Sequence, residues 1–185
     1  MAAGYRVGRY NSPTIRTYRE RICVNKSMIS KTALCRLLTQ LKTCCDEMVA
    51  DGFAHPTSFE VETVLGFLYY KEKNCDMVVL ETGMGGRLDA TNVIPDPQKL
   101  LAVFASVSMD HMAFLGDSLG QIAKEKAGII TQGCSVVTME QREEVMDVFQ
   151  KVCLEKQAVL TVSKPETASS CLLYTSDAAD DLIGV

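Results

Sequence analysis

Glu81 follows a short apolar run, Met77 to Leu80, and precedes a glycine-rich loop that extends from Gly83 to Leu88. If the run is a buried strand, its carboxyl end is where ligands bind in an open parallel sheet. A carboxylate there could bind a divalent cation that accompanies nucleotide phosphates, although a glutamate at a strand end is more often simply solvated. The loop is not the dinucleotide-binding fingerprint, because Leu88 occupies the third glycine position. By spacing alone it predicts a tight turn whose backbone approaches another group closely.

A second apolar run, Leu100 to Val107, ends in Ser108, Asp110 and His111. Parallel strands have their carboxyl ends at the same edge of a sheet, so Glu81 and His111 are predicted to act together on one cation. A lone histidine is more often a structural hydrogen-bonding group than a metal ligand. The residue types therefore permit a shared cation site, and the spacing alone leaves it open.

Lys126 lies on a predicted helix that begins after Ser118, four residues after Ile122 and three after Ala123. This spacing places Lys126 on the apolar face of the helix. Burial lowers the pKa of a lysine, and a neutral amine can react with carbon dioxide to form a carbamate, an anion able to hold a cation. The alternative is that the aliphatic stem packs while the ammonium group reaches water, and periodicity alone favours this second interpretation.

Strand and helix patterns alternate along the chain, which predicts an α/β layered domain. The two apolar runs that precede the polar groups are predicted to be strands covered on both faces. A helix from Pro56 onward begins with the capping-box spacing of Thr57 and Glu60, and its expected buried stripe is Val61, Val64, Leu65 and Leu68. The other predicted elements are strands at 5–10, 21–25, 135–139 and 158–162, a helix from Ser30 to Gly52, and a helix at 143–156.

Composition excludes several classes of protein. The chain has 185 residues, a net charge of -4, 47% hydrophobic and 23% charged residues, which is ordinary for a globular domain. The charge gives no case for nucleic acid or anionic lipid, and no apolar run approaches the roughly 20 residues that span a bilayer. Eight cysteines without a Cys-x-x-Cys pair, beside only two histidines, favour reduced buried thiols in a cytoplasmic protein over a zinc site.

Five segments, in the same order along the chain, resemble the folylpolyglutamate synthase/dihydrofolate synthase branch of the Mur ligase family. The sequence Leu-Asp-Ala-Thr-Asn at residues 88–92 is typical of the folate branch and distinguishes it from the cell-wall Mur ligases. Five ordered motifs are far more specific than any one of them. The segments are residues 8–13 with 19–22, 57–60, 81–94, 108–116 and 122–130.

The resemblance implies a fold and an activity. The implied fold is an incomplete Mur ligase central ATPase domain, an α/β structure with a P-loop-type, mostly parallel sheet and flanking helices. The implied enzyme is an ATP-dependent ligase that adds L-glutamate to tetrahydrofolate, to dihydropteroate or to both, through an acyl phosphate. ATP and Mg2+ are the expected cofactors, and small molecules the expected partners of a cytoplasmic monomer that binds neither nucleic acid nor membrane.

The resemblance also implies roles for single residues. Ser12, Glu81 and His111 match magnesium ligands of the family. Lys126 matches a carbamylated lysine whose added carboxylate supports a second magnesium near the acyl phosphate, so Lys126 and His111 are the expected catalytic residues. The residues that match the pteroate pocket are Thr57, Phe59, Asp89 and Ala90.

Two departures from the family pattern shape the expected domain organisation. Thr14 stands where the family usually has a histidine, and no Gly-x-x-x-x-Gly-Lys-[Ser/Thr] motif occurs in the chain. Residues 1–168 are therefore expected to be a partial ATPase domain without its P-loop, truncated and inactive in isolation. Residues 169–185 resemble translated adapter sequence and are expected to be a non-native tail. The alternatives are a non-catalytic remnant that still binds a pteridine, and a cell-wall amino-acid ligase.

Overall fold

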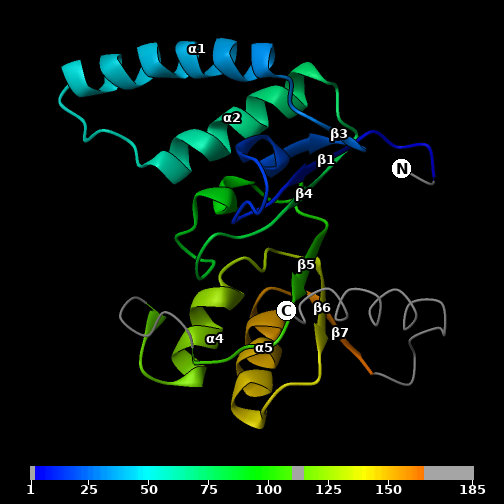
Figure 1. Cartoon of the computed structure of the whole chain (residues 1–185). Coiled ribbons are helices and arrows are strands. Elements are labelled where there is room, and N and C mark those ends of the chain that lie inside the picture. Colours follow the sequence, from blue (N-terminus) through cyan, green and yellow to red (C-terminus); the bar gives the residue numbers. More distant parts are fainter. Residues whose placement is uncertain (1–2, 110–114, 165–185) are drawn as a thin grey trace, which may run out of the picture. The chain divides into compact units, whose positions relative to one another are not determined.

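The computed structural model describes residues 3–109 and 115–164, which form two compact units. The first unit is Met1–Val93 and the second is Ile94–Val185. Among the described residues, each unit combines a small sheet with two α-helices (Figure 1). The α/β class predicted from the alternating patterns is confirmed.

The sheet of the first unit has the strand order β3-β2-β1-β4. β1 and β4 are parallel, with Tyr10 opposite Leu80, whereas β2 is antiparallel to both of its neighbours. The parallel pairing brings the residues that follow β1 next to those that follow β4. The strands are β1 (Val7–Tyr10), β2 (Ile22–Val24), β3 (Ser27–Met28) and β4 (Met77–Leu80).

α2 (Ser58–Glu72) packs on this sheet, and α1 (Lys31–Ala50) packs on α2. Ser30 caps α1 by accepting a hydrogen bond from the backbone N–H of Ala33. Thr57 and Glu60 form the predicted capping box at the start of α2. Two short 3-10 helices complete the unit, η1 (Tyr18–Arg21) and η2 (Ala90–Val93).

α2 lies close to β1 because each of the two elements has a glycine where they meet. A Cβ atom on Gly8 would lie 2.7 Å from Cδ1 of Tyr70, and one on Gly66 would lie 3.2 Å from Cδ2 of Tyr10. This contact rotates α2 away from the predicted stripe, and the prediction for Val64 is wrong, since its side chain is 43% exposed. The buried residues of α2 are Thr63, Leu65, Gly66, Tyr69 and Tyr70.

The second unit has a parallel sheet in the order β5-β6-β7, with α4 and α5 packed on one face (Figure 1). Ile122 of α4 and Phe149 of α5 are fully buried, and the Phe149 ring lies 4.5 Å from the ring of Phe104, between centroids. The elements are β5 (Leu101–Phe104), α4 (Leu119–Ala127), β6 (Ser135–Met139), α5 (Glu143–Glu155) and β7 (Val159–Ser163). The predicted elements of this half of the chain are confirmed.

The prediction that β4 and β5 are covered on both faces is wrong for the described residues. Val79 of β4 is 60% exposed and Val103 of β5 is 63% exposed. β5 alternates exposed and buried residues, because α4 and α5 pack on one face of its sheet.

The seven cysteines of the described residues are free thiols. The prediction that the thiols are buried is wrong for Cys35 and Cys44, which are exposed. None of the helices in that part of the chain has the length and apolarity that a membrane crossing requires.

Candidate active site

Glu81 is held in place by the two residues that follow the neighbouring strand. The backbone N–H of Ser12 donates to Oε2 of Glu81 at 2.7 Å, and Nδ2 of Asn11 donates to the same oxygen at 3.4 Å. The Glu81 N–H donates to the Tyr10 carbonyl at 3.0 Å, which continues the β1–β4 ladder. Among the described residues Oε1 of Glu81 accepts no hydrogen bond, so one carboxylate oxygen is fixed and the other is left for a ligand.

The donor set around Glu81 fits a hard divalent cation. The donors are a carboxylate oxygen of Glu81, the residue Ser12 and the side-chain amide of Asn11. Mg2+ prefers oxygen ligands. Oδ1 of Asn11 is buried and has no hydrogen-bond partner in the described structure. A buried carbonyl oxygen normally has a partner, so this oxygen is consistent with a further polar group beside Glu81. No group of three or more His, Cys, Asp or Glu side chains with metal-binding geometry occurs within residues 3–109 and 115–164.

The loop that follows β1 ends in a turn that Glu20 organises. Its carboxylate accepts hydrogen bonds from the backbone N–H groups of Ile15 and of Arg16, the latter at 3.0 Å. These hydrogen bonds lower the pKa of the Glu20 carboxyl group. The segment that carries Ser12 is therefore tied to η1, so the sequence motif around Arg19-Glu20-Arg21 has a positional role.

Asp89 organises the glycine loop that follows Glu81. Its Oδ2 accepts from the N–H groups of Gly83 at 3.0 Å and Met84 at 2.9 Å. Its Oδ1 accepts from the Thr91 N–H at 2.9 Å and from the Thr91 hydroxyl at 2.6 Å. A carboxylate has about four acceptor positions, and all of them serve the loop here. Asp89 therefore fixes the shape of the loop, whatever else it contacts.

Phe59 lies against the same loop. A Cβ atom on Gly83 would lie 2.4 Å from Cζ of Phe59, so only a glycine lets the ring approach this closely. The ring of Phe59 also makes an edge contact with Tyr10, with 6.1 Å between centroids. The Thr57 side chain is engaged in the capping box, and Ala90 starts η2, which contacts α2. The first unit thus places Phe59 and Asp89 against the loop, while Thr57 lies two residues before Phe59 and Ala90 follows Asp89.

The second unit carries the remaining predicted residues. Lys126 lies in the last turn of α4 and is half-buried, next to Ile122 and Ala123, which are fully buried, whereas Lys124 is exposed. The placement of Lys126 on the inner side of α4 agrees with its spacing. Lys126 is described only within its own unit. His111 lies outside the described residues.

Sequence reasoning assigned no role to Asn11 or Thr91. Asn11 follows β1 as Glu81 follows β4, so the rule that polar residues gather at parallel strand ends could have found it. Thr91 is 5% exposed and two residues from Asp89, a spacing typical of a local side-chain-to-backbone turn. Each of the two residues could have been found because it lies close in sequence to a residue that was already predicted to belong to the site.

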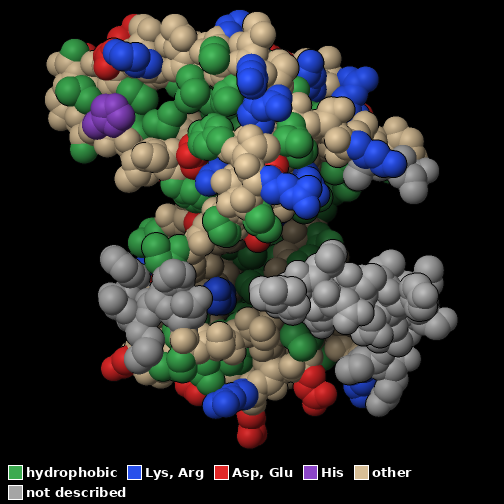
Figure 2. Space-filling view, viewed as in Figure 1, with side chains coloured by type: hydrophobic (Ala, Val, Ile, Leu, Met, Phe, Trp, Pro, Cys, Tyr) green, Lys and Arg blue, Asp and Glu red, His purple; other side chains and the backbone are tan. Residues whose placement is uncertain are grey.

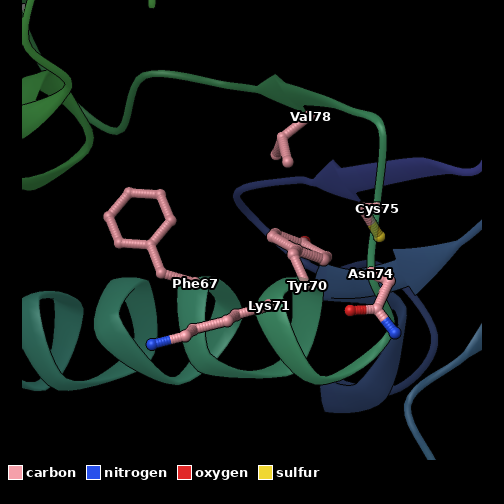
Figure 3. A pocket seen from close by; sticks show the side chains of 6 residues that line it. All are labelled: Phe67, Tyr70, Lys71, Asn74, Cys75 and Val78. Carbon is pink, nitrogen blue, oxygen red and sulfur yellow. The ribbon is translucent and has the colours of Figure 1, made fainter.

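Two surface grooves lie away from Glu81. One, of about 370 Å³, runs between the end of α2 and β4 and contains none of the predicted site residues; Figure 3 shows its lining, Phe67, Tyr70, Lys71, Asn74, Cys75 and Val78. The other, of about 410 Å³, adjoins the start of α2 at Ser58 and Glu62. Its wall includes His55, and the histidine of the described residues is drawn in purple in Figure 2. Neither groove replaces the Glu81 loop as the candidate site.

Comparison with models of protein families gives no match. The chain is 42% identical over 149 residues to the dihydrofolate synthase/folylpolyglutamate synthase of Bacillus subtilis, a match that spans 80% of this chain and 34% of that protein. It is 34% identical over 160 residues to the protein of the same name from Escherichia coli, spanning 86% of this chain and 35% of the relative.

Solved structures give the same result. The folylpolyglutamate synthase (FPGS) of Thermotoga maritima superposes with a TM-score of 0.77 at 38% identity, over 86% of this chain and 35% of that one. An FPGS–AMPPCP–folate complex superposes with a TM-score of 0.82 at 31% identity, over 87% of this chain and 39% of that one. The chain spans about a third of the length of these relatives. Over that span it belongs to the folylpolyglutamate synthase/dihydrofolate synthase family.

Proposed function

We propose that the chain is part of an ATP-dependent ligase that adds L-glutamate to tetrahydrofolate, to dihydropteroate or to both. The observation that carries the proposal is the Glu81 site, where one carboxylate oxygen is fixed by Ser12 and Asn11 and the other is free. Such a group suits a reaction in which several anions must meet. ATP transfers its terminal phosphoryl group to the substrate carboxylate, and the glutamate amine then displaces phosphate to form the amide.

The cation ligands in this proposal are Ser12, Glu81 and His111, with carbamylated Lys126 at a second cation. Bound Mg2+ would reduce the repulsion between the nucleotide phosphates and the substrate carboxylate. Glu81 orients its free oxygen through the two hydrogen bonds on Oε2. Lys126 is half-buried on α4, beside two fully buried side chains.

The pteroate-binding residues in this proposal are Thr57, Phe59, Asp89 and Ala90. Phe59 offers an aromatic face and Asp89 keeps the loop against it, so the loop and ring form one wall. An FPGS has been solved with AMPPCP and folate, which supports these two ligand classes. We further propose that residues 1–168 contribute to the central ATP-binding domain of a monomeric cytoplasmic enzyme. Residues 169–185 have no role in this proposal.

A chimera tests the proposal. The 149 aligned residues of this chain replace their counterparts in the Bacillus subtilis relative, and ATP-dependent incorporation of labelled glutamate into folate is measured. The chimera is expected to be active, and Glu81→Gln is expected to abolish activity, whereas Glu47→Gln on exposed α1 should have no effect. A folded chimera that incorporates no glutamate would overturn the proposal.

A further inference from the structure

Asn11 is the second residue that touches Glu81, and half of its side-chain amide has no partner. Its backbone N–H donates to the Arg21 carbonyl at 2.9 Å, which fixes the main chain at the end of β1. Its Nδ2 lies 3.4 Å from Oε2 of Glu81. Its Oδ1 is buried and accepts no hydrogen bond from any described residue.

An amide in this position has two distinct edges. The N–H edge faces the carboxylate, and the carbonyl edge is shielded from solvent without an acceptor role inside the described chain. A buried carbonyl oxygen is unfavourable unless a donor approaches it. This oxygen is shielded from water, so the amide can act on a cation only through Glu81. Its N–H edge holds Oε2 of the carboxylate and leaves Oε1 for the cation.

We propose that Asn11 is a positioning residue of the cation site: its Nδ2–H donates to Oε2 of Glu81 and so leaves Oε1 for the cation. The inference rests on the proposed function, which places the cation at Glu81. Groups that orient a metal ligand in this way typically change metal affinity about 10-fold to 100-fold when they are replaced.

The test uses the whole 185-residue chain and Mn2+ as the probe. Mn2+ broadens the NMR signals of nearby amides, so the signals of Ser12 and Thr82 report binding at Glu81 and give its dissociation constant. Asn11→Leu removes both edges of the amide and is expected to weaken Mn2+ binding about tenfold. Asn11→Asp replaces the N–H donor with a second carboxylate that attracts the cation, and it is expected to bind Mn2+ within a few-fold of the unmodified chain. Gln40→Leu, an equivalent change on the exposed side of α1, is expected to change nothing.

Thermal unfolding separates positioning from a purely structural role. Asn11→Asp places two carboxylates together, so its Tm is expected to fall in a chelator and to recover when Mn2+ is added. Asn11→Leu is expected to gain less from Mn2+ than the unmodified chain does. A merely structural asparagine would lower Tm equally with and without the cation in both variants, and that result would overturn the inference.

The remaining outcomes separate this inference from the proposed function. If Glu81→Gln loses Mn2+ binding while Asn11→Leu binds as tightly as the unmodified chain, Asn11 has no positioning role and the cation site stands. If Mn2+ broadens no signals near Ser12 and Thr82 in the unmodified chain, the cation site at Glu81 is itself refuted.

Discussion

The backbone N–H of Ser12 lies 2.7 Å from Oε2 of Glu81, so the end of one parallel strand holds the carboxylate that ends the next. Glu81→Gln keeps an oxygen for this hydrogen bond but removes the charge. We expect a stability loss of about 1 kcal/mol or less and loss of Mn2+ binding. Urea unfolding and an Mn2+ titration measure the two effects. A variant that unfolds much more easily but still binds Mn2+ would contradict the assignment of Glu81 as a ligand.

Gly83 and Phe59 form a contact that tolerates no side chain on the loop. Gly83→Ala would place a methyl group 2.4 Å from Cζ of Phe59, which predicts a stability loss of about 1–3 kcal/mol. The same substitution in a Phe59→Ala background should cost distinctly less, because the ring is gone. A double-mutant cycle followed by urea unfolding gives the coupling. Equal costs in both backgrounds would show that Phe59 does not lie on the loop.

Asp89 is expected to stabilise the loop through hydrogen bonds that an amide cannot replace. Asp89→Asn keeps one acceptor oxygen, so the hydrogen bonds to the other oxygen are lost. We expect the free energy of unfolding to fall by about 2 kcal/mol. Hydrogen exchange at the Gly83 and Met84 amides should become faster. The control is Asp46→Asn, which weakens the exposed pair with Lys42 and should leave stability almost unchanged, because solvent screens that pair. Unchanged exchange at Gly83 would contradict the network.

Two ion pairs of similar length should differ in importance because they differ in burial. Arg21 and Glu62 lie 2.7 Å apart with side chains 12% and 17% exposed, whereas Arg36 and Glu72 lie 2.6 Å apart at 52% and 40%. Glu62→Ala leaves the Arg21 charge buried and is expected to cost about 3 kcal/mol. Glu72→Ala should cost much less, because solvent screens the exposed pair. Similar losses for the two variants would contradict the role of burial.

The capping box of α2 should respond to acid. The backbone N–H and hydroxyl of Thr57 lower the pKa of the Glu60 carboxyl group below its ordinary 4.5. A lowered folded-state pKa means that the stabilisation is complete above the unfolded-state pKa and is lost as the pH falls through the folded-state value. Hydrogen exchange in the first turn of α2 should therefore accelerate below about pH 4 relative to the helix centre. Glu60→Gln keeps the hydrogen bonds without titrating and should remove this pH dependence.

The sequence predicts best those features that are encoded by neighbours in the chain. The caps at Ser30, Thr57 and Ser118 depend on residues three positions away, and the structure has all three. Burial was predicted less well, because it depends on what packs on each face. Val64 is exposed since the glycine contacts of α2 set its rotation, and Val79 is exposed on a strand whose pattern predicted full burial.

The site was predicted only in part, because some of its contacts depend on how distant parts of the chain fold together. Ser12 and Glu81 can be selected from the sequence, but the sequence predicts residues 100–107 as the strand that ends beside Glu81. In the described structure β4 pairs with β1 instead, and the hydrogen bond between Ser12 and Glu81 results. The use of Asp89 as the acceptor for four loop hydrogen bonds depends on a three-dimensional turn that no spacing specifies. The proposed roles of His111 and Lys126 remain predictions, the first because it lies outside the described residues.

The most direct test of the proposed ligase is the fate of the oxygen atoms on the folate carboxylate. In the Bacillus subtilis chimera, a folate substrate labelled with heavy oxygen at its terminal carboxylate should transfer one labelled oxygen to inorganic phosphate for each amide bond formed. That transfer is required if ATP phosphorylates the carboxylate before the amine attacks. We predict labelled phosphate in the chimera and none in its Glu81→Gln variant. Amide formation with unlabelled phosphate, or ATP cleavage with no folate product, would contradict the acyl-phosphate ligase.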